Sequence, residues 1–378
     1  ANIDWSAKIM SLNVEFAVPG RLQVRGLALL HTALNDAALA AWDAQLAYNR
    51  PSPAATDQRI KAPAGVDASV STFPSSQATL AGAAAAVLAY VFPTAAAGRF
   101  DAMAKDAAMA HVWTGETFQS DADAGLALGK LIGERAVAYG KADGSDAKWD
   151  KSTMPKGPGI WQPTPPKFPD PLVPLGGTWK TWALPTGSAL RPAAPPKYGS
   201  DFWKAELQAV QMAVANRTIA EERLAQWYQI SGPFPAYNAW AHEIFQRAAL
   251  DLPHAARIMA YLNVAYADTA IAIWDSKYTW WTERPITADP TLKTAFPTPP
   301  YPSFPSGFSS VMGNGSAVLG AFFPAEQEEL DALAWEGTRS RCWAGIHYGI
   351  DDEVGMQMGR TVGRLICSLA MADGVGGI

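Results

Sequence analysis

The chain has 378 residues, of which 30 are basic and 35 acidic, and charged residues make up only 17% of it. This mildly acidic balance gives no reason to expect binding to nucleic acid or to an anionic membrane, and it favours a small-molecule partner. No apolar run reaches the roughly 20 residues that cross a membrane, so we expect a soluble protein without a membrane span. The sequence begins at Ala1 rather than Met, which leaves localisation unknown, and export after removal of a signal peptide is one interpretation.

Helical patterns fill the first 151 residues. Over residues 22–48, apolar side chains recur at three- and four-residue steps, which is the period of one buried helix face. Runs in which apolar and polar residues alternate are few, so strands are not expected. We therefore predict an N-terminal helical half over residues 1–151, with helices at 22–48, 76–92, 95–113 and 121–142.

Residues 152–200 are rich in proline. The prolines recur at such short spacing that no long helix fits between them. The segment also contains large aromatic residues, which favour packing against a folded core over disorder. These residues are Trp161, Phe168, Trp179 and Trp182. We therefore predict an ordered strap over residues 152–200 that joins two helical halves.

Helical patterns return over residues 201–378. The longest of them ends before Arg284-Pro285, because the residue that precedes a proline resists the α conformation. The predicted helices cover residues 201–230, 235–250, 252–281, 308–323, 325–337 and 351–371. The sequence therefore predicts an all-α fold whose C-terminal part, residues 201–378, is a bundle of at least four helices.

The first candidate site residues lie near the end of the longest predicted helix. Trp274 and Lys277 are three residues apart and share one helix face. Arg284 follows shortly after, so an ammonium and a guanidinium point to the same region and suit an oxyanion. The alternative is that Lys277 is only a favourable cation in the last turn and that Trp274 fills the core.

A second candidate segment is Pro305-Ser306-Gly307, directly before a predicted helix. A helix start presents free backbone N–H groups and the positive end of the helix dipole, and Ser306 adds a hydroxyl. An anion is stabilised at such a position. The alternative is an ordinary N-cap formed by Ser306.

The third segment contains Arg341, His347 and Asp351. An arginine fork makes two parallel hydrogen bonds to oxyanion oxygens. A carboxylate four residues after a histidine can hold the imidazole in one tautomer. The alternative is that Asp351 and its neighbour Asp352 are acidic residues favoured at a helix N-terminus, and that His347 is structural.

In combination, the three segments resemble the superfamily of type 2 phosphatidic acid phosphatases, bacterial class A acid phosphatases and vanadium-dependent haloperoxidases. The resemblance rests on Lys277 with Arg284-Pro285, on Pro305-Ser306-Gly307-Phe308, and on Ser340-Arg341 with His347. Trp274, the proline-rich strap and residues 31–38 extend it to bacterial vanadium chloroperoxidase-like proteins. The resemblance implies an α-helical architecture built around two four-helix bundles.

The resemblance also implies a cofactor and the residues that hold it. It assigns the oxygens of vanadate, or of phosphate or sulfate in its place, to Lys277, Arg284, Ser306, Gly307 and Arg341. It makes His347 the ligand of vanadium. Tyr301 lies where members of the family vary the residue near the halide, and Trp274 belongs to the same pocket.

Phe308 departs from the family pattern. Members normally carry a second histidine directly after Ser-Gly, which assists peroxide binding in the peroxidases and protonates the leaving group in the phosphatases. Phenylalanine has no titratable or hydrogen-bonding group. General acid–base assistance is typically worth ~10²- to 10⁴-fold, so the usual reactions should be strongly weakened at this altered catalytic position.

The expected function is that of a vanadium haloperoxidase-like protein, an oxidoreductase that oxidises halide with hydrogen peroxide and can pass the halogen to an organic acceptor. Three alternatives stay open. One is a repurposed, vanadate-independent enzyme for an organic substrate, in which Lys277, Arg284 and Arg341 stabilise a developing oxyanion and His347 is the base. The others are an acid phosphatase-like hydrolase and an inactive oxyanion-binding homologue. Exposed tryptophan-rich faces would be consistent with a homodimer.

Overall fold

The structure is a computed structural model, which describes residues 2–61 and 70–375. In these ranges the chain is helical and has no named strand; one isolated antiparallel bridge joins Ile160 and Thr282. The prediction of an all-α fold is confirmed. None of the described helices combines the length and the apolar composition needed to cross a membrane.

Contacts between Cα atoms divide the chain into two compact units. Unit 1 contains the residues up to Ala142 together with His242–Asn263, and unit 2 contains Asp143–Ala241 and the residues from Val264 onward. The division therefore passes through two helices, Pro233–Arg247 (α9) and Leu252–Trp280 (α10). The sequence-based division into residues 1–151, 152–200 and 201–378 stays a prediction.

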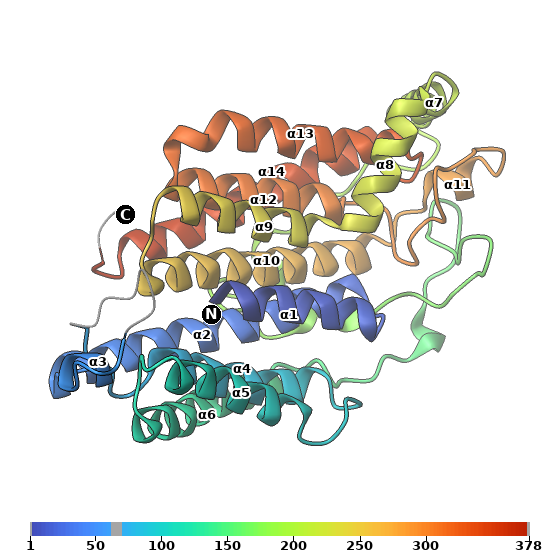
Figure 1. The fold of residues 1–378 in the computed structure, drawn as a ribbon. Coiled ribbons are helices and arrows are strands. Elements are labelled where there is room, and N and C mark those ends of the chain that lie inside the picture. The colour runs from blue at the N-terminus through green and yellow to red at the C-terminus, as the bar shows by residue number, and fades with distance from the viewer. Residues whose placement is uncertain (1, 62–69, 376–378) are drawn as a thin grey trace. The chain divides into compact units, whose positions relative to one another are not determined.

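Unit 1 is a helical bundle (Figure 1). Small residues allow its helices to pack closely. A Cβ atom added to Gly82 would lie 2.4 Å from the carbonyl oxygen of Leu126, and one added to Gly129 would lie 1.9 Å from that of Thr79. The helix backbones therefore touch almost directly, because no side chain separates them. Its helices are α1 (Asn2–Glu15), α2 (Gly20–Tyr48), α3 (Pro53–Thr56), α4 (Ser76–Val91), α5 (Arg99–Trp113) and α6 (Gln119–Lys141).

Unit 2 contains the strap and the remaining helices. Figure 1 shows α12, α13 and α14 running side by side. The strap is fastened to α10 by two carboxylates: Asp268 accepts three backbone N–H bonds from residues 182–184 at 2.7–2.8 Å, and Asp275 pairs with Arg191. The helices are α7 (Asp201–Ala215), α8 (Ile219–Ser231), α11 (Pro285–Ala288), α12 (Gly307–Phe322), α13 (Gln327–Trp343) and α14 (Gly349–Met371), with parts of α9 and α10.

The prediction of one continuous helix over residues 201–230 is wrong. The chain forms α7 and α8, with a break between Ala215 and Ile219. Thr218 explains the break, because its hydroxyl accepts a bond from the N–H of Glu221 while the Glu221 carboxylate accepts one from the N–H of Thr218. This reciprocal capping box starts a new helix. The helix α1, for which no prediction was made, is a second difference.

Helices α12 and α14 approach each other most closely at glycines. A Cβ atom on Gly355 would lie 2.3 Å from the carbonyl oxygen of Ser306, and one on Gly359 would lie 1.8 Å from that of Ser310. Each glycine therefore lets the start of α14 lie against the start of α12. This approach brings the second and third candidate segments together.

We expect Gly359→Ala to lower the free energy of unfolding by about 1–3 kcal/mol or more, because the added methyl group would force the backbones of α12 and α14 apart. Equilibrium urea unfolding measures the change. The matched control is Gly20→Ala at the first position of α2, where nothing lies within 4 Å of the added Cβ. Equal midpoints for the two variants would contradict the close approach.

Candidate active site

Each candidate residue lies at the end of a helix or in the loop beside it, within unit 2. Lys277 is in the last turn of α10, and Arg284 caps α11. Ser306 caps α12, and its hydroxyl accepts a bond from the N–H of Ser309. Arg341 lies in the last turn of α13. His347 follows in the loop before α14, so the three sequence segments meet where several helices end.

His347 is 2% exposed and is held by hydrogen bonds on both ring nitrogens. Its Nδ1 lies 3.0 Å from Oδ2 of Asp351, and its Nε2 lies 3.1 Å from Nη1 of Arg284. A guanidinium can only donate, so Nε2 accepts, and the proton of the neutral ring is on Nδ1. Ser303 donates to the same Asp351 oxygen at 2.5 Å, and the N–H of Tyr348 donates to it at 3.1 Å. The imidazole is therefore fixed with its Nε2 lone pair towards Arg284.

Burial and positive charge keep His347 neutral. Burial is the main cause that lowers its pKa well below the usual range, and the charges of Arg284, Lys277 and Arg341 lower it further. All three predicted cations thus lower the pKa of one imidazole, and Arg284 is the one that contacts it directly. We call Lys277, Arg284 and Arg341 the cationic cluster.

Lys277 and Arg284 are both fully buried. The Lys277 ammonium donates to the carbonyl oxygens of Pro302 and Ser303 at 2.7 and 2.8 Å, which uses two of its three donors. Burial lowers its pKa well below the usual range, and the charge of Arg284 adds to this shift. A buried cation beside another cation is stabilised by an anion between them.

Arg284 has a nitrogen without a partner. Its Nε donates to the carbonyl oxygen of Tyr301 and its Nη1 to that of Ile346, at 2.8 and 2.7 Å. Its Nη2 is buried and has no hydrogen-bond partner. A buried donor without a partner is costly, and an oxyanion beside His347 would satisfy it. The site therefore fits a tetrahedral oxyanion.

Arg341 is oriented away from the expected direction. Its three nitrogens donate to Ser340 Oγ, Gln229 Oε1 and the carbonyl oxygen of Ala225, at 2.9, 3.1 and 3.2 Å. Its guanidinium carbon lies 4.0 Å from the centre of the Phe308 ring. Arg341 thus belongs to the cationic cluster because its charge lowers the pKa of His347. Its Nη1 and Nη2 donate to residues of α8.

Phe308 covers the Arg341 guanidinium and is itself partly exposed. Its ring meets that of Tyr228 edge to face, with centroids 5.8 Å apart. A cation over an aromatic face is attracted by the ring quadrupole. Phe308 therefore contributes packing and a cation–π contact, but it supplies no proton.

Tyr301 and Trp274 form the other wall of the cluster. Their ring centroids are 5.1 Å apart, and the Tyr301 ring lies 5.1 Å from Lys277 Nζ and 5.0 Å from the Arg284 guanidinium carbon. Trp274 donates to the carbonyl oxygen of Leu172 in the strap. Gly307 lies beside Trp274, with ordinary contact distances of 3.5 Å and more around an added Cβ.

Asp352 is a buried carboxylate that the sequence analysis treated only as a residue favoured at a helix start. It accepts hydrogen bonds from Ser309 Oγ at 2.8 Å and from Cys342 Sγ at 3.2 Å. Burial raises its pKa to about 7, against the opposing effect of hydrogen bonds from Ser309, Ser306 and Cys342. The sequence carried one weak signal of this group, which is a second acidic residue directly after Asp351.

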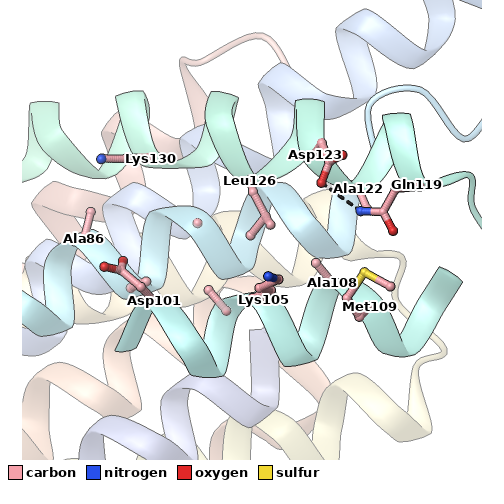
Figure 2. A pocket seen from close by; sticks show the side chains of 13 residues that line it. Ala86, Asp101, Lys105, Ala108, Met109, Gln119, Ala122, Asp123, Leu126 and Lys130 are labelled. Carbon is pink, nitrogen blue, oxygen red and sulfur yellow. Dashed lines mark hydrogen bonds between the residues drawn. The ribbon is translucent and has the colours of Figure 1, made fainter. Parts of the chain in front are cut away.

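A pocket of about 370 Å³ lies in unit 1, between α4, α5 and α6 (Figure 2). Its lining consists mostly of small and apolar residues, with the charged side chains of Asp101, Lys105, Asp123 and Lys130 among them. It contains none of the candidate site residues. Within residues 2–61 and 70–375, no group of three or more histidine, cysteine, aspartate or glutamate side chains could hold a metal ion.

Searches against protein-family models and against curated protein sequences find no match for the chain. Solved structures do match it. The crystal structure of a bacterial vanadium-dependent iodoperoxidase matches with a TM-score of 0.75 and 23% identity, over 97% of this chain and 94% of that one. The holo and apo forms of a bacterial vanadium-dependent chloroperoxidase match with TM-scores of 0.69 and 0.67 and identities of 14% and 13%. Both chloroperoxidase matches cover 94% of this chain. They cover 93% of the chain in the holo structure and 95% of the chain in the apo structure.

These matches extend over almost the whole chain, and at such low identities they concern the fold. The chain therefore has the fold of the bacterial vanadium-dependent iodo- and chloroperoxidases.

Proposed function

We propose that the chain binds vanadate beside His347 and acts as a vanadium haloperoxidase-like oxidoreductase with altered proton handling. The observation that carries the proposal is the buried Nη2 of Arg284, which has no partner and lies on the residue that contacts His347 Nε2. Two further cations act on the same imidazole. A tetrahedral oxyanion between these groups would neutralise the buried positive charge and satisfy the unpaired donor.

The roles of the residues follow from their positions. Lys277 and Arg284 would hold the oxyanion oxygens, together with the Ser306 hydroxyl and the backbone N–H of Gly307 at the start of α12. Arg341 would contribute positive charge, and it would hold an oxygen only after turning away from its partners on α8. The N–H of Gly307 lies in the first turn of α12, where a backbone N–H has no partner within the helix.

His347 would be the vanadium ligand through Nε2. Asp351 keeps the proton on Nδ1, so the lone pair is on Nε2. That lone pair accepts from Arg284 Nη1 in this structure, and Arg284 would give up this bond to an oxyanion oxygen when vanadium binds. When bound, vanadate would supply Lewis-acid activation of hydrogen peroxide for attack by halide.

Phe308 determines what is unusual about the proposed reaction. No proton donor or acceptor stands at this position, so peroxide must gain and lose protons through solvent or through another residue. The apolar ring that covers Arg341 also suits an organic acceptor for the oxidised halide. Phosphomonoester hydrolysis is a weaker candidate, because the leaving group needs a proton at the position that Phe308 holds.

Vanadate binding followed by halide oxidation tests the proposal. We expect calorimetry to detect binding of orthovanadate, and we expect slow oxidation of iodide or bromide by hydrogen peroxide only when vanadate is present. Binding without oxidation would favour an oxyanion-binding homologue or a repurposed enzyme. Hydrolysis of a chromogenic phosphomonoester, inhibited by vanadate, would favour the phosphatase alternative. Absence of vanadate binding by the folded protein would contradict the proposal.

A further inference from the structure

We propose that Asp352 is a positioning residue that sets the direction of the Ser306 hydroxyl through Ser309, so that oxyanion binding is coupled to uptake of a proton by Asp352. This inference rests on the proposed oxyanion site, in which Ser306 donates to the bound anion. It concerns a buried carboxylate that makes no described contact with His347.

The proposal starts from an unbroken chain of hydrogen bonds. Ser306 Oγ lies 3.0 Å from Ser309 Oγ, Ser309 Oγ lies 2.8 Å from Asp352 Oδ1, and Cys342 Sγ lies 3.2 Å from Asp352 Oδ2. The side chains of Ser306 and Ser309 are fully buried, and Asp352 is 4% exposed. Each hydroxyl has one hydrogen to donate, so the direction of one bond determines the direction of the next.

When Asp352 is ionised, the hydrogen bonds of Ser306 and Ser309 are directed towards Asp352 and away from the proposed oxyanion site. A carboxylate only accepts, so Ser309 donates its one hydrogen to Asp352. In its bond with Ser306, Ser309 can then only be the acceptor. In the fully bonded arrangement, the hydrogen of Ser306 points towards Ser309 or Asp352 and a lone pair of Ser306 faces the oxyanion; turning the hydrogen to the oxyanion would break that bond. Two oxygen lone pairs facing each other repel, and binding is weakened.

When Asp352 is neutral, the direction of these hydrogen bonds is reversed. Its hydroxyl donates to Ser309, Ser309 donates to Ser306, and the hydrogen of Ser306 is then free to bond an oxyanion. The Sγ–H of Cys342 can donate to the other Asp352 oxygen in both states. The donor that the proposed site needs is therefore available without the loss of a hydrogen bond only after Asp352 has taken up a proton.

The surroundings of Asp352 bring this change near neutral pH. Burial raises its pKa to about 7, and the charge of Asp351 contributes in the same direction. The charged groups that interact with Asp352 from the neighbouring elements are Lys277, Arg284 and Arg341, and Glu206 on α7 acts on its partner Cys342. A bound oxyanion adds negative charge nearby and raises the proton affinity of Asp352 further.

Vanadate affinity of the wild type and of Asp352→Asn, measured by calorimetry across pH 5.5 to 9, tests the coupling. Asparagine imitates the neutral carboxyl group, since its amide nitrogen can donate to Ser309 while its oxygen accepts from Cys342. Titration of vanadate itself and of His347 affects both proteins, so it cancels in the ratio of their dissociation constants. We expect this ratio, wild type over variant, to be flat below pH 6 and to rise by up to about tenfold for each pH unit above 7.

Ser309→Ala separates the hydroxyl chain from a purely electrostatic effect of Asp352. This change removes the hydroxyl that links Ser306 to Asp352 and leaves only their weaker direct interaction. The dependence of vanadate affinity on pH should therefore become shallower than in the wild type, although Asp352 still ionises. The matched control is Glu353→Gln, an exposed neighbour on the same turn, which should behave as the wild type. Thermal melts establish that each variant is folded.

The outcomes separate the two proposals. Absence of vanadate binding by the wild type at every pH overturns the oxyanion site and with it the proposed function. Binding by the wild type with a pH-independent ratio to Asp352→Asn overturns the coupling alone. A full wild-type pH dependence in Ser309→Ala overturns the hydroxyl chain and leaves only a charge effect of Asp352.

Discussion

Replacing Phe308 with histidine is expected to raise the rate of vanadate-dependent halide oxidation by ~10²- to 10⁴-fold, the usual worth of a positioned acid–base group. The reason is local. Phe308 directly follows Ser306 and Gly307 at the start of α12, and its ring lies on the Arg341 guanidinium, beside the proposed oxyanion position. An imidazole there could exchange a proton with bound peroxide, which phenylalanine cannot do.

The measurement is the steady-state rate of iodide and bromide oxidation at saturating vanadate. Phe296→His is the matched control, because Phe296 also lies over Arg341, with the guanidinium carbon 5.4 Å from its ring centre, but does not follow the Ser-Gly pair. It should gain no activity. A Phe308→His protein that is folded, binds vanadate and is no faster than the wild type would show that turnover is limited elsewhere.

Replacing Arg284 with glutamine is expected to weaken vanadate binding by roughly 30- to 700-fold, which corresponds to about 2–4 kcal/mol for lost charge-assisted hydrogen bonds. Arg284 is fully buried, supplies the unpaired Nη2 and contacts His347 Nε2. Removing it takes away a charge and two donors from the proposed site at once. The loss should therefore be among the largest of any single substitution in the cationic cluster.

Calorimetry with orthovanadate measures this loss. Arg284→Lys should bind with intermediate affinity, because it keeps the charge but not the planar fork. The control is Arg364→Gln, an exposed arginine on α14, which should leave the affinity unchanged. Circular dichroism must accompany these measurements, since Arg284 also bonds the carbonyl oxygens of Tyr301 and Ile346. Unchanged vanadate affinity in a folded Arg284→Gln protein would rule out the proposed arrangement.

Much of the helical fold could be predicted from periodicity alone. The predicted helix over residues 252–281 corresponds to α10, and the one over residues 308–323 corresponds to α12, within a few residues at each end. The break between α7 and α8 was missed, because apolar residues continue across it with helical spacing. The reciprocal bonds of Thr218 and Glu221 decide that a second helix starts there.

The candidate residues of the cationic cluster could also be found in the sequence, since their side-chain types and spacing carry the chemistry. Their orientation could not. Arg341 bonds Gln229 and Ala225 on α8, residues more than 100 positions away, and nothing in its own segment predicts these partners. The same is true of Asp352, whose contact with Ser309 depends on how closely α14 lies against α12.

The sequence by itself therefore determined that the chain is helical. Through the family resemblance it also supplied the residues proposed to hold an oxyanion and the expectation that Phe308 stands where the family carries a proton-handling histidine. Only the tertiary structure decided which donor is left unpaired, which tautomer His347 adopts, and that Asp352 is joined to Ser306 through Ser309. The physical reason is the distance along the sequence over which each property is determined. Helical periodicity and residue chemistry are local properties, whereas burial, pKa and the direction of hydrogen bonds depend on groups brought together from distant parts of the chain.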